Sequence, residues 1–236
     1  MNNLSKTNRY SVVNRKEPLQ HRHSRHPSED LYVIGITGTN GKTTVTHLLG
    51  EVLRSAGYKP FILGTLNSGD INLTTPEAPD IMKFMRKHLQ QGGTHFIMEV
   101  TSEGIDQDRV LDILFDVKLL TNISQDHLDY HKTMEQYTAV KMKFMTEGNA
   151  HTIMPSTFSE IPIDFTTQLI GAFNLLNIKA AVSILRYMHI DEQHIQQALA
   201  RCHAPRGRLE NVAQGQPFML LIDYAHTPDA IMNVLK

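Results

Sequence analysis

Short apolar runs alternate along this chain with longer segments in which apolar residues recur every three or four positions. The runs at residues 31–36, 60–63, 96–100 and 117–120 are mostly apolar. Such runs predict strands that are buried on both faces of a parallel sheet, because a strand covered on one face alternates apolar and polar residues. A further short strand is expected at residues 218–222.

The segments between these runs have helical periodicity. Helices are predicted after residue 44, ending at Gly57, and at residues 80–91, 134–145, 173–188 and 191–200, with one more beginning at Thr227. Asp80, Asp191 and Thr227 are the expected N-caps of three of them. Alternating strands and helices predict an α/β fold, with a mostly parallel sheet between two helical layers.

A glycine-rich loop follows the first predicted strand and opens the first predicted helix. Backbone N–H groups of such a loop form a cradle for phosphate, with a lysine charge and a hydroxyl ligand for Mg²⁺ nearby. We therefore expect ATP at Gly38, Thr39, Asn40, Gly41, Lys42, Thr43 and Thr44, with Lys42 at the β/γ-phosphates and Thr43 on the metal. Ile36 stands where the strict P-loop pattern has its first glycine, so a plain glycine turn before a helix is the alternative.

The composition narrows the possible partners. The 236 residues carry a net charge of -1, and no apolar run of membrane-spanning length occurs, so nucleic acid and membranes are not expected partners. The single cysteine, Cys202, excludes an internal disulfide and is interpreted as a small core residue. These features predict a cytoplasmic protein. The polar residues 1–30 are interpreted as a disordered tail, in preference to a metal-binding tract at residues 21–26.

Six further segments occur in a characteristic order. They lie at residues 74–76 (Thr-Thr-Pro), 98–102 (Met-Glu-Val-Thr-Ser), 121–131 (Thr-Asn-Ile-Ser-Gln-Asp-His-Leu-Asp-Tyr-His), 171–177 (Gly-Ala-Phe-Asn-Leu-Leu-Asn), 207–210 (Gly-Arg-Leu-Glu) and 223–228 (Asp-Tyr-Ala-His-Thr-Pro). Together with the loop, they resemble the Mur ligases, and among these the UDP-N-acetylmuramoyl-tripeptide synthetases. The resemblance implies an ATP- and Mg²⁺-dependent ligase that adds an amino acid to UDP-N-acetylmuramoyl-dipeptide through an acyl-phosphate.

The resemblance also implies roles for single residues. Thr43, Glu99, His127 and Lys141 would be the metal ligands, with Lys141 binding through a carbamate on its amine. Lys42, Lys141 and His127 would form the catalytic set. Asn174, Asn177, Arg208 and Asp223 would contact the nucleotide, and Thr74, Thr75, Thr101 and Ser102 the UDP-muramoyl substrate. The simpler alternatives are a salt bridge for Glu99, a hydrogen-bonding role for His127, helix capping for Asn174, and a turn for Thr74 and Thr75. For Lys141 the alternative is a solvated helix lysine, and Lys143 could take its place in the motif.

The chain departs from the family in three respects. Residues 1–30 stand in place of the first domain, residues 31–216 match the central ATP-binding domain, and residues 217–236 match the start of the C-terminal Rossmann-like domain. Glu103 stands where the family usually has histidine. A nucleotide-binding module without ligase activity, a separate chain that supplies the missing domains, and a folylpolyglutamate or cyanophycin synthetase-like ligase therefore remain alternatives. The amino acid that is added is not predicted.

Overall fold

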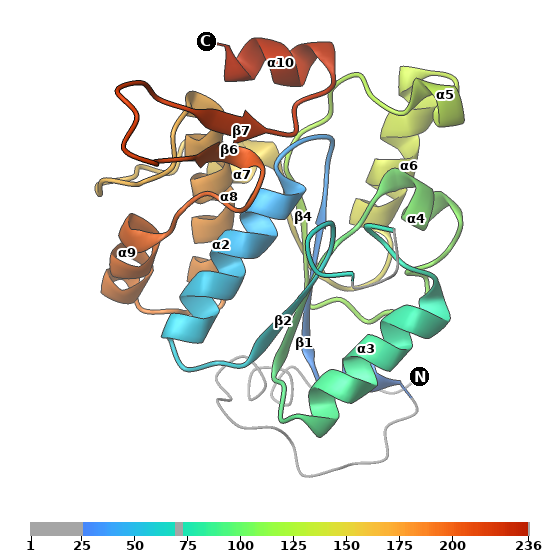
Figure 1. The fold of residues 1–236 in the computed structure, drawn as a ribbon. Coiled ribbons are helices and arrows are strands. Elements are labelled where there is room, and N and C mark those ends of the chain that lie inside the picture. The colour runs from blue at the N-terminus through green and yellow to red at the C-terminus, as the bar shows by residue number, and fades with distance from the viewer. Residues whose placement is uncertain (1–25, 69–72, 236) are drawn as a thin grey trace.

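The computed structural model describes residues 26–68 and 73–235 and centres on a five-stranded parallel sheet (Figure 1). Its strands are β1 (Tyr32–Thr37), β2 (Pro60–Leu63), β3 (His95–Glu99), β4 (Val117–Leu120) and β5 (His151–Ile153), in the order β2-β3-β1-β4-β5. The central strand β1 is fully buried. The segments that follow β1, β3 and β4 all leave the same edge of the sheet, because the strands are parallel.

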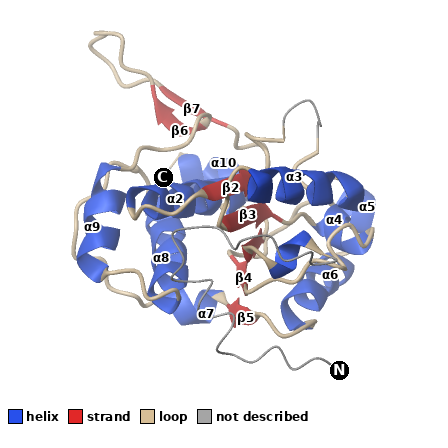
Figure 2. Ribbon diagram, turned by 90° about the horizontal axis from the view of Figure 1, so that it is seen from below, coloured by secondary structure: helices blue, strands red, loops and turns tan. Residues whose placement is uncertain are grey.

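Helices cover both faces of the sheet (Figure 2). Helices α2 (Lys42–Ser55), α8 (Ala172–Tyr187) and α9 (Glu192–Arg201) lie on one face, and α3 (Ala78–Gln90), α4 (Ser102–Asp106) and α6 (Met134–Thr146) on the other. The sheet therefore has two hydrophobic cores, one under α2, α8 and α9 and one under α3, α4 and α6. Tyr32, Ile34 and Ile36 of β1 belong to the former and Val33 to the latter, as the alternation of side chains along a strand requires. The predicted three-layer, mostly parallel fold is confirmed.

Several predicted boundaries differ from the structure by one to three residues, and two of these shifts have a clear cause. The N-cap position of helix α3 is Glu77 rather than Asp80, and the Glu77 side chain makes no cap bond. The helix begins earlier than predicted because Pro79 fits the first turn of a helix, where its missing N–H is not needed. The last strand, β7, spans Leu221–Asp223 rather than residues 218–222. Its position is set by antiparallel pairing with β6 (Arg208–Asn211). Asp191 and Thr227 cap α9 and α10 (Pro228–Val234) as predicted, through bonds from His194 N and Ala230 N.

Short elements were not predicted, since three to five residues carry little periodicity. They are η1 (Pro27–Glu29), α4, α5 (Leu128–His131), β5, α7 (Pro155–Phe158) and β6. Residues 26–30, predicted as part of the tail, instead fold onto the domain: the buried Ser28 accepts a bond from Leu114 N through its hydroxyl. Residues 1–25 lie outside the described part of the chain. The expected domain boundary at residue 217 falls between the paired strands β6 and β7.

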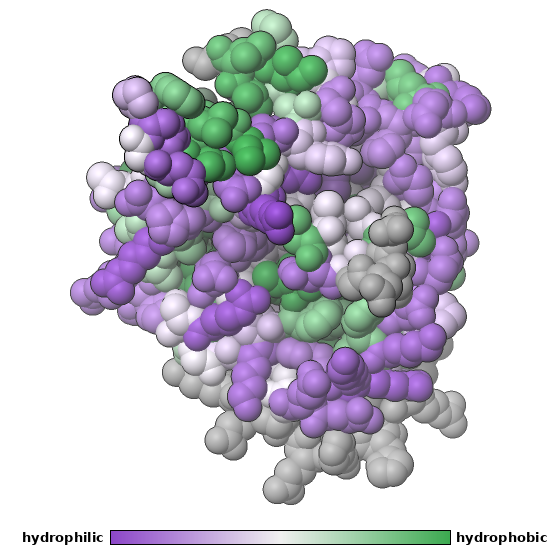
Figure 3. All heavy atoms as spheres, viewed as in Figure 1, coloured by the Kyte–Doolittle hydropathy of each residue, from purple (hydrophilic) through white to green (hydrophobic). Residues whose placement is uncertain are grey.

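On the face drawn in Figure 3, apolar residues gather on the β6–β7 hairpin and α10. Phe218, Met219, Leu220, Ile231, Met232 and Leu235 are exposed there. Among the described residues, no helix combines the length and the hydropathy that crossing a membrane requires.

Candidate nucleotide and metal site

The glycine-rich loop leaves the carboxyl end of β1 and turns into α2. Gly38 has φ 138° and Gly41, the N-cap of α2, has φ 89°, and side chains rarely allow these conformations. A Cβ atom would also lie 1.9 Å from Thr121 Oγ1 at Gly38 and 2.3 Å from Asn177 Oδ1 at Gly41. The first N–H groups of α2 have no acceptor within the helix and point out of its N-terminus. The loop is therefore shaped to receive an anion.

Side chains from two other segments hold the loop in place. The Thr39 hydroxyl lies 2.9 Å from Tyr137 OH and donates to Ser124 O at 3.2 Å. Asn40 N donates to Asn122 Oδ1, and the Asn122 amide donates back to Asn40 O at 3.0 Å. Burial and the nearby carboxylates raise the pKa of Tyr137, so its phenol stays protonated. The cradle is preorganised by these contacts before any nucleotide arrives.

Two lysines converge on one carbonyl of the loop. Lys42 Nζ donates to Gly38 O at 2.8 Å and to Thr39 O at 2.9 Å, and Lys141 Nζ donates to Gly38 O at 3.1 Å. Lys141 is 1 % exposed, whereas the side chain of Lys143 is 46 % exposed on the same helix. Burial and the charge of Lys42 move the pKa of Lys141 well below its usual range, and burial also lowers that of Lys42. Lys141, not Lys143, is the lysine that faces the loop.

A hydroxyl and a carboxylate meet beside the loop. The Thr43 hydroxyl donates to Glu99 Oε2 at 3.0 Å and accepts from Arg208 Nη2 at 3.2 Å. Glu99 is 2 % exposed at the end of β3, and its other oxygen accepts from Thr65 N at 2.9 Å. Among the described residues, no salt bridge forms at Glu99. These hard oxygen donors fit Mg²⁺.

Thr43, Glu99 and His127 line one cavity beside the loop. His127 pairs there with Glu103, with 2.8 Å between His127 Nδ1 and Glu103 Oε1. Burial alone would raise the pKa of Glu103, but hydrogen bonds from His127 and Ser102 and the His127 charge lower it to about 2. The same bond raises the pKa of His127. In the described chain, no three His, Cys, Asp or Glu side chains converge as a ready-made metal site. Thr43, Glu99 and His127 therefore share this cavity without forming a closed cage, whereas Lys141, the fourth predicted ligand, does not line it.

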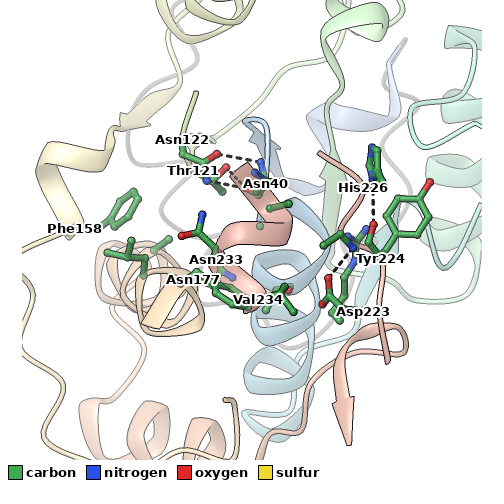
Figure 4. A pocket seen from close by; sticks show the side chains of 18 residues that line it. Asn40, Thr121, Asn122, Phe158, Asn177, Asp223, Tyr224, His226, Asn233 and Val234 are labelled. Carbon is green, nitrogen blue, oxygen red and sulfur yellow. Dashed lines mark hydrogen bonds between the residues drawn. The ribbon is translucent and has the colours of Figure 1, made fainter. Parts of the chain in front are cut away.

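A second, largely apolar cavity of about 140 Å³ adjoins the loop between α8 and α10 (Figure 4). Phe158, Asn177 and Tyr224 line it, together with Phe173, Leu176 and Asp223. Asn174 does not reach this cavity: it is 1 % exposed, donates to Ile170 O at 2.7 Å, and accepts from Asn177 Nδ2 at 3.1 Å. Asn174 instead orients Asn177, whose amide lies beside Gly41.

The β6–β7 hairpin contributes Arg208 and Asp223. Arg208 stacks over the Tyr224 ring at 4.8 Å and lines both cavities. Asp223 accepts from Leu209 N and Ala225 N, both at 2.7 Å, so its carboxylate shapes the hairpin at the edge of the apolar cavity. Together they bring the end of the chain to the phosphate loop.

The predicted substrate residues lie at the far side of the larger cavity, whose volume is about 500 Å³. Thr74, Thr75 and Thr101 line this cavity, whereas Ser102 is buried and does not. Thr75 Oγ1 donates to Glu99 O and accepts from Thr101 N, and the Thr101 hydroxyl caps α4. Arg109, which the sequence did not indicate, donates to Thr75 O at 2.8 Å.

Comparison with known proteins agrees with this geometry. The Mur ligase middle domain model matches residues 36–155, just over half of the chain. The UDP-N-acetylmuramoyl-L-alanyl-D-glutamate–2,6-diaminopimelate ligase of Aquifex aeolicus is 36% identical over 261 residues, which cover 89% of this chain and 53% of that protein. The chain thus spans about half the length of the curated relatives it matches.

Two solved structures share the fold. A UDP-N-acetylmuramoyl-L-alanyl-D-glutamate–2,6-diaminopimelate ligase superposes with a TM-score of 0.70 at 24% identity, covering 87% of this chain and 53% of that one. The folylpolyglutamate synthase/dihydrofolate synthase of Yersinia pestis, solved with AMPPNP and a Mn ion, gives 0.64 at 19% identity and covers 86% and 64%. The matched middle-domain model carries the assignment, and the chain belongs to the Mur ligase family.

Proposed function

We propose that this chain is the nucleotide-binding part of an ATP-dependent ligase that joins an amino acid to UDP-N-acetylmuramoyl-dipeptide through an acyl-phosphate. The observation that carries the proposal is the phosphate loop with the Thr43–Glu99 pair beside it, between an apolar cavity and a larger polar one. The apolar cavity suits a nucleoside, and the polar one suits an acceptor carboxylate. The names of the relatives support the choice of acceptor.

ATP would lie with its phosphates on the N-terminus of α2 and its base in the apolar cavity. Lys42 would leave the loop carbonyls that it now contacts and bind the phosphates instead, because a hydrogen bond to a charged phosphoryl oxygen is stronger than one to a neutral carbonyl. Asn177 can both donate to and accept from an adenine edge. Arg208, already above Thr43, would neutralise charge that develops on the transferred phosphoryl group.

Thr43, Glu99 and His127 would hold Mg²⁺ together with the phosphates. When bound, the ion would draw charge from the phosphoryl oxygens and align the acceptor carboxylate. The acceptor carboxylate oxygen attacks the γ-phosphorus and ADP leaves; the amine nitrogen then attacks the acyl carbon, phosphate leaves, and the amine loses a proton. The residues of this chain bind, orient and neutralise, and none of them forms a covalent bond to the substrate.

Lys141 is proposed to carry a carbamate. A buried amine with a lowered pKa is partly neutral, and its lone pair can attack CO₂ to form an N–C bond with release of one proton. The product replaces a buried cation beside Lys42 with an anion, which removes the repulsion between the two ammonium groups. The remaining N–H can still donate to Gly38 O.

Lys143 supplies the matched control for the carbamate. Protein equilibrated with ¹³C-labelled bicarbonate should give a carbamate carbon signal in the wild type and in Lys143→Ala, and none in Lys141→Ala. Equal signals in all three proteins would place the carbamate elsewhere, and no signal in the wild type would reject it.

Ligase activity is tested by phosphate release from Mg-ATP. We expect release that requires UDP-N-acetylmuramoyl-dipeptide and an amino acid, and that Lys42→Ala abolishes. Lys83→Ala, which removes an exposed lysine paired with Asp80 on α3, should leave release unchanged. Nucleotide binding without substrate-dependent release would favour the alternative of a binding module. Release that persists in Lys42→Ala would contradict the proposed loop chemistry.

A further inference from the structure

Glu103 stands where the resemblance leads to a histidine, and its carboxylate is fixed from two sides. It is the second residue of α4, in the first turn after the Thr101 cap. Oε1 lies 2.8 Å from His127 Nδ1, and Oε2 accepts from the Ser102 hydroxyl at 3.3 Å. The Glu103 side chain is 25% exposed and lines the larger cavity with His127. Nothing in the proposed chemistry so far uses this carboxylate.

The contact determines which imidazole nitrogen carries hydrogen. A carboxylate accepts but does not donate, so a 2.8 Å contact requires Nδ1 of His127 to be the donor. In the neutral ring, Nε2 then carries the free lone pair. Nε2 lies 3.5 Å from Asp126 Oδ2, too far for a strong hydrogen bond. The pairing with Glu103 thus leaves Nε2 available as a ligand atom.

The backbone of His127 is also fixed. His127 has φ 52° at the start of α5, and its N–H donates to Asp126 Oδ1 at 2.9 Å. The Tyr137 ring, which also holds the phosphate loop through Thr39, lies 6.2 Å from the imidazole. With the backbone fixed, the Glu103 bond is the contact that sets the rotation of the ring. Without it, either nitrogen can turn toward the cavity.

We propose that Glu103 is a positioning residue that holds His127 in the Nδ1–H form and presents the Nε2 lone pair to the divalent cation of the nucleotide complex. This inference rests on the proposed function, since His127 is assigned to the cation there. It deepens that assignment, because histidine ligands of metals generally donate their second ring nitrogen to a carboxylate or carbonyl. In this chain the carboxylate of Glu103 is the partner of His127 Nδ1.

The tautomer can be read directly in the metal-free protein. Long-range ¹H–¹⁵N correlation spectra, recorded well above the pKa of the imidazole, should show His127 as Nδ1–H in the wild type. Glu103→Gln should keep this form, because its amide oxygen still accepts, whereas Glu103→Ala should lose it. A wild-type ring protonated on Nε2, or an unchanged tautomer in Glu103→Ala, would overturn the positioning role.

The consequence for the cation is measured with Mn²⁺ and AMPPNP as the probe, by electron paramagnetic resonance of free Mn²⁺. Loss of such a supporting contact weakens metal binding by about 10- to 100-fold, so Glu103→Ala should show that loss. Glu103→Gln should stay close to the wild type. Glu160→Ala removes an exposed carboxylate from another part of the surface and should bind as the wild type does. Wild-type affinity in Glu103→Ala would refute the inference while leaving the nucleotide site intact.

The two proposals fail in different ways. If the wild type binds AMPPNP and Mn²⁺, and Lys42→Ala does not, the nucleotide site stands, and the comparison of Glu103→Ala with Glu103→Gln decides the role of Glu103. If the wild type binds no Mn²⁺–AMPPNP, the proposed function fails and the cation part of the inference falls with it. The tautomer spectra still decide whether Glu103 orients the ring.

Discussion

Lowering the pH should destabilise this fold through His95, at the start of β3. The imidazole is fully buried between the rings of Tyr32 and Tyr58, with centroids 5.4 and 4.8 Å away. Nδ1 contacts Thr94 Oγ1 at 2.8 Å, and Nε2 has no hydrogen-bond partner in the part of the chain that the structure describes. Burial, with a smaller effect of His88, lowers the pKa of His95 to about 3. The neutral ring is therefore the form that the core accepts.

The sign and size follow from linkage. A histidine in the unfolded chain takes up a proton below about pH 6.5, whereas the folded chain takes up none at His95 until about pH 3. The contribution of neutral His95 to the free energy of unfolding is therefore fully present above about pH 6.5 and is lost as the pH falls from there toward about pH 3. A pH of about 5 lies about 1.5 pH units below the unfolded pKa, so protonation of the unfolded chain lowers the free energy of unfolding there by roughly 2 kcal/mol.

The assay is urea unfolding of the wild type and of His95→Phe at several values between about pH 7.5 and pH 5. The phenyl ring keeps the aromatic packing and carries no proton, so its stability curve should be flatter by roughly 2 kcal/mol over this range. The readout is the difference in slope, which does not depend on how well the phenyl ring packs. His203→Gln, at an exposed position, controls for the loss of a histidine. Parallel curves for the wild type and His95→Phe would refute the reasoning.

Three further changes test other parts of the structure. Gly41→Ala places a Cβ 2.3 Å from Asn177 Oδ1 at φ 89°, so AMPPNP affinity in calorimetry should fall at least about tenfold, and an unchanged affinity would contradict the close approach. Lys118→Met removes two 2.7 Å bonds from Lys118 Nζ to carbonyls at the end of α6, which should lower the free energy of unfolding in urea by about 2 kcal/mol. Lys143→Met should change this free energy by under about 0.5 kcal/mol. Equal effects of the two substitutions would show that Lys118 does not cap the end of α6. Arg208→Ala should weaken AMPPNP binding by about tenfold without loss of folding, seen as an unchanged urea midpoint.

The buried strands could be predicted from the sequence because both of their faces are covered. Each of β1 to β4 is a short apolar run, and helices cover both faces of the sheet. The edge strand β5 has the residues His151, Thr152 and Ile153, of which the first two are exposed, so no apolar run marks it. Pairing with Val117 and Lys118 of β4 makes it a strand. Tertiary contact, not local pattern, decides such an element.

The candidate site could be predicted where a backbone motif defines it and less well where side-chain direction does. Lys141 and Lys143 are both plausible from the sequence, but two residues on a helix point to opposite sides, and the packing of α6 buries only Lys141. Asn174 and Asn177 lie on one side of α8, where one amide bonds to the other. Periodicity therefore found the helices, but not which of two similar side chains reaches the cavity.

The contacts between distant segments are the part that local sequence reasoning reaches last. Arg208 bonds to Thr43 across 165 positions of the chain, and Tyr137 bonds to Thr39 across 98. Only the order of the motifs pointed to the first contact, and nothing in the sequence pointed to the second. Both act on the same loop: Tyr137 holds the Thr39 hydroxyl, and Arg208 adds charge beside the Thr43 hydroxyl. In the proposed function the loop residues would specify where phosphate binds, while residues from α6 and the β6–β7 hairpin would determine how rigid and how positively charged that place is.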